Sequence, residues 1–150
     1  MRNSREWSEK QDRRNLISVE LYGSRSACLS SSDPMSVTRF EDLKCWKHAK
    51  NFAVELYQTS DNGEFGKDFG SKDQVRRAAV SIASTIAEGK ERETVSEFIR
   101  YLYVAKGSAG ELKTQVLIAA DIGYLSRERA EELRAKIEAL SAMLGALIKK

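Results

Sequence analysis

After Thr38, apolar residues recur at alternating steps of three and four, the spacing that places side chains on one face of an α-helix. The first such segment ends near Thr59, and its apolar positions are Leu43, Trp46, Ala49, Ala53 and Leu56. It opens with Thr38-Arg-Phe-Glu41, which has the spacing of a capping box. The pattern therefore predicts a first helix that begins at this box.

A second helix is predicted between two end signals. Ser71-Lys-Asp-Gln74 has capping-box spacing at the start, and Gly89 tolerates the left-handed backbone of a helix C-terminus. The apolar face is small, so another helix can approach it closely; it consists of Val75, Ala78, Ala79, Ile82 and Ile86. The opposite face is a polar stripe, either solvated or a contact surface for a partner, made of Arg77, Ser81, Ser84 and Glu88.

Two further helices carry heptad seams, which are typical of helices that pack nearly parallel to one another. The third opens at the capping box Thr94-Val-Ser-Glu97, and Ser126 caps the fourth. The seam of the third helix consists of Phe98, Leu102, Ala105, Ala109, Leu112, Val116 and Ala119. The seam of the fourth helix consists of Ala130, Leu133, Ile137, Leu140, Leu144 and Leu147. Gly107-Ser-Ala-Gly110 lies within the third helix, where each glycine costs about 1 kcal/mol relative to alanine. We expect a close helix crossing at this small patch.

The connections between the helices are short. Residues 60–70 contain three glycines and no period, which predicts a loop, and we expect Phe65 and Phe69 to pack into the bundle from it. Charged residues 90–93 and the glycine-containing segment 121–125 predict turns. The sequence therefore predicts an all-α fold, an antiparallel up-down four-helix bundle over residues 35–150.

Residues 1–34 differ in composition from the rest of the chain. They are polar and charged, and they end in a serine run followed by Pro34, which is typical of a linker. We expect a poorly ordered N-terminal extension. Met35 follows directly, so the extension is either a regulatory tail or a misassigned start, with Met35 as the authentic first residue.

Composition places the chain among globular proteins. It has 150 residues, enough for one domain with a sizeable core, and 41% of them are hydrophobic. The net charge of +3 is too small to indicate a nucleic-acid binder by itself. No apolar run approaches the length of a membrane span, and the basic N-terminus lacks the apolar core of a secretory signal. Cys28 and Cys45 are expected to be free thiols rather than a disulfide, which favours a cytoplasmic protein.

The residues that catalysis or metal binding would need are missing from the sequence. A di-iron bundle needs Glu-x-x-His motifs, and this chain has one histidine, His48, in no such motif. His48 and Cys45 supply only two ligands for zinc, and no nucleophile elbow or phosphate-binding loop is present. Glu88 and Glu111 are expected to pair with arginines rather than act as paired acids. We therefore expect no enzyme, no catalytic residue, no metal, no cofactor and no small-molecule substrate.

Basic side chains leave a binding function open. The candidates for phosphate contacts are Lys44, Lys47, Arg76, Arg77, Lys90 and Arg92. The alternative is that these residues only solubilise helix exteriors. Because residues 35–150 hold 19 basic and 17 acidic side chains, an asymmetric distribution rather than net charge has to support binding. Tyr101, Ser108 and Gln115 lie seven apart on the third helix and suit a subunit contact as well as a groove.

Several motifs together resemble one family of four-helix bundles. They are Phe40-Glu-Asp-Leu-Lys-Cys-Trp-Lys-His-Ala49, Gln74-Val-Arg-Arg-Ala-Ala-Val-Ser-Ile82, Ile86-Ala-Glu-Gly89 and Gly107-Ser-Ala-Gly-Glu-Leu-Lys-Thr-Gln115. The chain is similar over residues 38–148 to the proteins encoded in intervening sequences of bacterial 23S ribosomal RNA genes. It departs from their pattern at Ala83-Ser-Thr85, at Lys113 and in lacking a proline after the first helix.

The resemblance implies a ring-like homopentamer with a basic surface. A related branch, the accessory variability determinant of diversity-generating retroelements, implies RNA or a reverse transcriptase as a partner. We thus expect a non-enzymatic, oligomeric bundle that binds nucleic acid or a nucleic-acid-handling protein. The alternative is a purely structural module that only assembles with itself. The residues expected to serve assembly and packing are Arg77, Ser81, Glu88, Gly89, Gly107, Ser108, Gly110 and Glu111.

Overall fold

A computed structural model describes residues 39–150 of the chain. The predicted N-terminal extension over residues 1–34, Met35 as a start, and the capping residue Thr38 lie outside the described residues and stay predictions.

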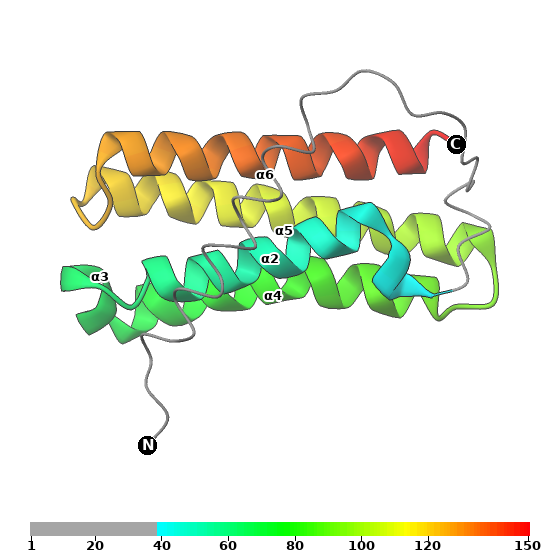
Figure 1. The fold of residues 1–150 in the computed structure, drawn as a ribbon, viewed down its shortest axis with the longest axis horizontal. Coiled ribbons are helices and arrows are strands. Elements are labelled where there is room, and N and C mark those ends of the chain that lie inside the picture. Colours follow the sequence, from blue (N-terminus) through cyan, green and yellow to red (C-terminus); the bar gives the residue numbers. More distant parts are fainter. Residues whose placement is uncertain (1–38) are drawn as a thin grey trace. The chain divides into compact units, whose positions relative to one another are not determined.

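Four long helices pack side by side in the described part of the chain (Figure 1). The elements are the 3₁₀ turn η1 (Phe40–Asp42), α2 (Lys44–Thr59), α3 (Gly63–Lys67), α4 (Phe69–Lys90), α5 (Val95–Asp121) and α6 (Arg127–Ile148). No strand occurs between residues 39 and 150. The prediction of an all-α fold with four long helices is confirmed.

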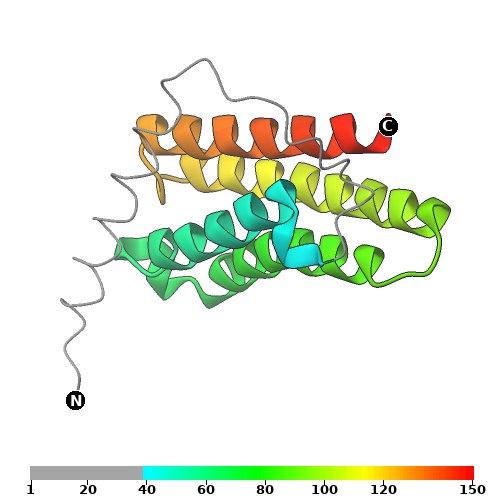
Figure 2. The same cartoon turned by 45° about the vertical axis from the view of Figure 1, so that its right-hand side comes forward.

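Side-chain contacts between neighbouring helices give their directions. The last turn of α2 meets the first turns of α4, because Arg76 Nε donates to Ser60 Oγ at 2.9 Å. The end of α4 meets the start of α5, where Gly89 lies against Tyr101 and Phe98, and the hydroxyls of Ser81 and Ser108 are 3.0 Å apart at the middles of the two helices. The end of α2 also meets the start of α6, where Arg129 donates to Thr59 Oγ1. Neighbouring helices therefore run in opposite directions, as both cartoon views show (Figures 1 and 2).

The core is built from the predicted apolar faces. Leu102, Ala105, Ala109 and Leu112 of α5 have no solvent exposure at all, and every predicted seam residue of α5 and α6 is buried. On α2 and α4 the predicted apolar residues are buried too, apart from the half-buried Trp46. The two heptad seams therefore face one shared core, as their period predicts.

The start of α2 differs from the prediction. The chain forms the 3₁₀ turn η1 where a helix was expected, then passes through an extended residue, Leu43, before α2 begins at Lys44. Leu43 is 3% exposed, and no side chain caps the helix. The start of α2 is therefore determined by the burial of Leu43 rather than by the capping-box spacing. The predicted end at Thr59 is correct.

The predicted loop at 60–70 is wrong in part, because it contains α3 and the first two residues of α4. Phe65 is 2% exposed and stacks on Tyr124, with ring centroids 5.4 Å apart, so it packs into the bundle as expected. Phe69 is 75% exposed, which corrects the expectation for that residue. Since α4 already begins at Phe69, helical geometry turns its side chain away from the core.

Asp68, rather than a Ser71–Gln74 capping box, caps α4. Asp68 Oδ1 accepts from the backbone N–H of Ser71 at 3.0 Å, and Oδ2 accepts from the hydroxyls of Ser71 and Tyr124. These hydrogen bonds, first those from Ser71, hold the pKa of the Asp68 carboxyl below its usual range. The same carboxylate therefore starts α4 and ties it to the turn before α6.

Gly89 does not end its helix, which corrects the predicted left-handed cap. Helix α4 continues to Lys90, and its C-cap Glu91 has a right-handed helical backbone. A Cβ on Gly89 would lie 2.5 Å from the Cβ of Tyr101 and 3.2 Å from the ring of Phe98. Glycine is needed here because α5 approaches the backbone of α4.

The glycines of α5, unlike Gly89, are not approached closely by another helix. A Cβ on Gly107 or Gly110 would meet nothing within 4 Å, and both residues are exposed. The predicted close crossing at these glycines is therefore wrong within one chain. Ser108 and Ala109, which lie between them, face the neighbouring helices instead.

We predict opposite stability changes for two Gly→Ala substitutions inside helices. Gly89→Ala should lower the free energy of unfolding by about 1–2 kcal/mol, because overpacking of about 1–3 kcal/mol exceeds the helix-propensity gain. Gly145→Ala of α6 is the matched control, since its Cβ would meet only Lys106 Nζ, at 3.7 Å. The Gly145→Ala control should raise the free energy of unfolding by about 0.5–1 kcal/mol. Urea titrations followed by circular dichroism measure both, and a stabilising Gly89→Ala would refute the close approach.

Candidate nucleic-acid interface and assembly face

The six cations predicted to contact phosphates fall into two groups at opposite ends of the bundle. Lys44 and Lys47 open α2, and Lys90 and Arg92 lie at and just beyond the end of α4, so antiparallel packing places all four at one end. Arg76 and Arg77 belong to the early turns of α4, at the other end (Figure 1). The structure therefore brings four of the six together.

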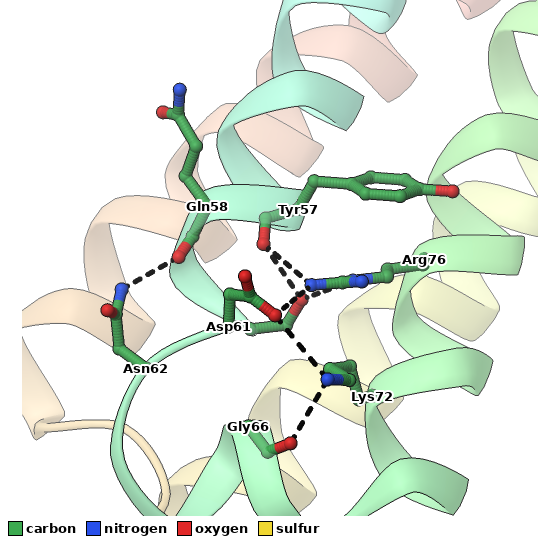
Figure 3. A network of polar contacts seen from close by, with 8 residues as sticks. Tyr57, Gln58, Asp61, Asn62, Gly66, Lys72 and Arg76 are labelled. Carbon is green, nitrogen blue, oxygen red and sulfur yellow. Dashed lines mark hydrogen bonds and ion pairs between the residues drawn. The ribbon is translucent and has the colours of Figure 1, made fainter. Parts of the chain in front are cut away.

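Arg76 is held inside a network that joins α2 to α4 (Figure 3). Its guanidinium donates to Ser60 Oγ at 2.9 Å and to both the Tyr57 carbonyl oxygen and Asp61 Oδ1 at 3.0 Å. It also lies 4.5 Å from the centroid of the Tyr57 ring. Ser60 is fully buried, and its hydroxyl donates to the Tyr57 carbonyl oxygen at 3.3 Å, so Arg76 supplies the donor to the hydroxyl oxygen.

Lys72 extends the same network to α3. Its Nζ donates to the Gly66 carbonyl oxygen at 3.0 Å and lies 3.4 Å from Asp61 Oδ1. Hydrogen bonds from Arg76 and Lys72 hold the pKa of the Asp61 carboxyl below its usual range. The network thus fixes the α2–α3–α4 connection, and Arg76 is committed to it rather than free for a ligand.

Arg77, next in sequence, is placed quite differently. Its side chain is 74% exposed and approaches only Asp73, at 3.7 Å and one turn away on the same helix. An exposed pair of this kind contributes little to stability. Arg77 is accessible, but it lies far along α4 from Lys90 and Arg92.

We define the cationic end as residues 39–51, 80–108 and 139–150, the half of the bundle where α2 and α5 begin and α4 and α6 end. It contains ten Lys or Arg against six Asp or Glu, a formal charge of +4. The other described residues contain nine against eleven, a formal charge of −2. The small net charge of the chain therefore conceals a separation of charge along the bundle.

Most of the cations at this end have no acidic partner. Between residues 39 and 150, no carboxylate lies within salt-bridge distance of Lys44, Lys47, Lys90, Arg92, Arg100 or Lys106. Lys90 and Arg92 instead lie over aromatic rings, 5.5 Å from the centroid of Phe98 and 5.0 Å from that of Tyr101. Arg92 also donates to the Tyr101 hydroxyl.

At the other end of the bundle, cations of one helix form ion pairs with carboxylates of a neighbouring helix. Glu55 of α2 accepts from both Lys136 and Arg129 of α6, at 2.7 and 2.8 Å. Lys113 of α5 meets Glu138 of α6 at 2.8 Å. Cations that stabilise the bundle thus concentrate away from the cationic end.

The sequence prediction missed several members of this group. Lys50, Lys149 and Lys150 belong to the cationic end because of where their helices begin and end. A helix-by-helix map of the antiparallel bundle, rather than local clusters of basic residues, is the signal that finds them.

The residues predicted to serve assembly also divide into two groups. Ser81 and Ser108 bond to each other within the chain, and Gly89 packs against α5. The others are exposed on α4 and α5: Arg77, Glu88, Gly107, Gly110 and Glu111. Neither Glu88 nor Glu111 pairs with an arginine of the described chain; Glu111 accepts from Gln115 Nε2 at 3.2 Å.

The outer side of α5 is unusually apolar. Of the ten large hydrophobic residues that are exposed between residues 39 and 150, six lie on α5 or its C-cap: Val95, Tyr103, Val104, Leu117, Ile118 and Ile122. A shallow hollow lies beside this face, between the start of α4 and the end of α5. Its walls are mainly apolar and include Phe65, Val75, Ile118 and Ile122.

The other candidate groups for chemistry are isolated in the described part of the chain. Residues 39–150 contain no group of three side chains able to hold a metal ion. Cys45 is a buried thiol whose pKa is raised by that burial, and His48 is exposed on α2. Within the same residues, no helix combines the length and apolar character needed to cross a membrane.

Comparisons with known proteins identify the family. The family model described as 23S rRNA-intervening sequence protein matches residues 41–146. A solved structure is also similar: a protein of unknown function from the S23 ribosomal protein family of Bacteroides thetaiotaomicron. It is 24% identical, covers 71% of this chain and 99% of its own, and has a TM-score of 0.65, which supports the fold. No curated protein matches. The chain belongs to the 23S rRNA-intervening sequence protein family.

We predict that neighbouring arginines of α4 differ in their effect on stability. Arg76→Ala should lower the free energy of unfolding by about 1–3 kcal/mol, because it removes the charged donor to the buried Ser60 hydroxyl oxygen and to the Tyr57 carbonyl oxygen. Arg77→Ala is the matched control and should stay within about 0.5 kcal/mol of the parent chain. Urea titration measures both values, and equal effects would show that the network around Arg76 contributes nothing.

Proposed function

We propose that this member of the family binds nucleic acid without catalysing a reaction, through phosphate contacts at the cationic end. One observation carries the proposal: four helix ends bring together cations that have no carboxylate partner in the described chain, Lys44, Lys47 and Lys90 among them. The preferred ligand is RNA, in keeping with the family to which the chain belongs.

Phosphate is the ligand chemistry that suits these cations. Unpaired surface lysines that neutralise phosphates release condensed counterions, and this release supplies most of the affinity in sequence-independent binding. Arg92, which lies over the ring of Tyr101, adds a planar cation of the kind that contacts phosphates and bases. Helix dipoles give the competing explanation for Lys90, Lys149 and Lys150, which lie where cations stabilise the C-termini of α4 and α6. That explanation does not apply to Lys44 and Lys47, which lie in the first turn of α2.

A second function, self-association, is favoured by a different observation. The outer face of α5 exposes large apolar side chains together with Gly107 and Gly110, and such faces mark protein contacts. We propose that copies of this chain assemble through it, with a ring of five as the form that the family resemblance implies. A reverse transcriptase or another nucleic-acid-handling protein is the further partner that the resemblance suggests.

We predict strong salt dependence of binding to a short hairpin RNA. The parent chain should bind at low salt, with the logarithm of the association constant falling linearly with the logarithm of salt concentration. The triple variant Lys44→Gln, Lys47→Gln, Lys90→Gln should bind at least tenfold more weakly, with a slope smaller by roughly 2 to 3, since each phosphate that is no longer neutralised removes about 0.9 from the slope. Fluorescence anisotropy at several salt concentrations measures both quantities.

A second triple variant, with the same loss of positive charge, distinguishes binding at the cationic end from a general effect of net charge. Lys67→Gln, Arg127→Gln, Arg134→Gln removes three cations from the other end and should leave affinity and slope close to those of the parent chain. Equal weakening by both triple variants would mean that only net charge matters. No association of the parent chain at low salt would end the nucleic-acid proposal.

The molecular mass of the protein in solution tests self-association separately from nucleic-acid binding. We expect light scattering to give a molecular mass of several copies at micromolar concentration, because exposed apolar faces of this kind are covered by partners. The Ile118→Asp variant should shift the mass toward one copy, while Val54→Asp on α2 serves as the control. A parent chain that stays monomeric would contradict the assembly proposal and leave the nucleic-acid proposal standing.

A further inference from the structure

We propose that the cationic end binds an unpaired nucleotide of RNA, whose base stacks on the guanidinium of Arg92 while Lys90 contacts a neighbouring phosphate. The inference rests on the nucleic-acid binding proposed above and names its ligand class, single-stranded segments of RNA rather than A-form duplex. It starts from a cation that lies over an aromatic ring in the turn that joins α4 to α5 (Figure 1).

Arg92 is held by an aromatic side chain rather than by a carboxylate. Its guanidinium carbon lies 5.0 Å from the centroid of the Tyr101 ring, and its Nη2 donates to the Tyr101 hydroxyl. Glu91 and Glu93 flank it in sequence, yet neither lies within salt-bridge distance of a cation between residues 39 and 150. Because Arg92 is exposed, its guanidinium contacts the ring and stays accessible to a ligand.

The ring beneath Arg92 is fixed in the bundle. Tyr101 is half-buried, and its Cβ lies 2.5 Å from where a Cβ of Gly89 would be, so the side chain packs on the backbone of α4. The backbone N–H of Arg92 donates to the Gly89 carbonyl oxygen at 3.3 Å. Both members of the pair are therefore anchored at the same glycine, and the guanidinium is held in place before a ligand arrives. Such preorganisation lowers the entropic cost of binding.

Lys90 supplies a second cation next to this pair. Its Nζ lies 5.5 Å from the centroid of the Phe98 ring. Phe98 and Tyr101 are one turn apart on α5 and both pack against Gly89, so the two cation–ring pairs are neighbours. Phe98 is 4% exposed, so its own ring is not available for stacking. A planar guanidinium beside an ammonium suits the base and the phosphate of one nucleotide.

A guanidinium that lies on an aromatic ring is suited to a nucleobase. Its plane is weakly hydrated and stacks on aromatic faces, whereas an ammonium makes only a point contact. In proteins that bind RNA, unpaired bases stack on aromatic side chains or on arginine planes. The bases of an A-form duplex are stacked on one another, and its deep, narrow major groove excludes side chains. Arg92 therefore favours loops, bulges and single-stranded ends over duplex.

Charge alone predicts the opposite preference. Each neutralised phosphate contributes about 0.9 to the salt slope for a B-form duplex and about 0.7 for a single strand, because phosphates are denser along a duplex. A cationic surface without stacking therefore binds a duplex at least as tightly as a single strand. Tighter binding of the single strand distinguishes stacking from charge.

Three ligands of equal strand length test the stacking. They are an oligouridine, the duplex of that strand with oligoadenylate, and an abasic ribose oligomer that keeps every phosphate and lacks the bases. We expect the full chain to bind the oligouridine about fivefold or more tightly than the abasic oligomer, the lower end of what stacking of one base contributes. The oligouridine should also bind more tightly than the duplex. Fluorescence anisotropy at low salt measures the three dissociation constants.

Variants assign the preference to the pair in the turn. Arg92→Lys keeps the charge but lacks the plane, so it should remove most of the preference for the oligouridine. Tyr101→Leu removes the ring beneath the guanidinium and should act in the same direction, and circular dichroism confirms that each variant is folded. Arg127→Lys is the matched control and should keep the preference. Arg127 is exposed at the start of α6, at the other end of the bundle, and lies over no ring of residues 39–150.

The outcomes separate this inference from the proposed function. A parent chain that binds the duplex or the abasic oligomer as tightly as the oligouridine would overturn the stacking and leave phosphate binding in place. A preference that is unchanged in Arg92→Lys would overturn the role of Arg92. Absence of binding to all three ligands at low salt would remove both the stacking and the nucleic-acid proposal.

Discussion

The close approach of α4 and α5 is the constraint on which the rest of the structure depends. Gly89 lets Tyr101 and Phe98 pack directly on the backbone of α4, and the serine pair at the centre keeps the two helices in register. Once these helices are aligned, the fully buried seam of α5 receives α6 on its other side. The ends of four helices then coincide, and with them the cations that no carboxylate neutralises.

The periodic parts of the fold were predictable from sequence, and the helix ends were not. Apolar spacing identified the buried faces of all four long helices because burial is what that spacing records. Capping patterns misplaced the starts of the first two helices, which begin instead after Leu43 and Asp68. Gly89 was correctly singled out but for the wrong reason, since a glycine near a helix end suits a left-handed cap and a close helix contact equally well.

The candidate site shows a similar division. Basic residues were recognisable in the sequence, but their partners were not, because those partners come from other helices. Arg76 and Arg77 are adjacent and chemically identical, yet one holds a buried hydroxyl and a carbonyl oxygen while the other is exposed. Only the antiparallel arrangement separates the cations engaged within the bundle from those left at the cationic end.

The two surfaces of α5 suggest how the assembly and the cationic end relate to each other. Its inner face is buried in the bundle, whereas its outer face exposes Tyr103, Leu117 and Ile118, so covering that face with another copy links folding to association. An assembly of several copies carries several cationic ends. A long nucleic acid that binds more than one of these ends gains affinity from effective concentration, without any additional interaction. Self-association would in this way strengthen phosphate binding at the cationic end.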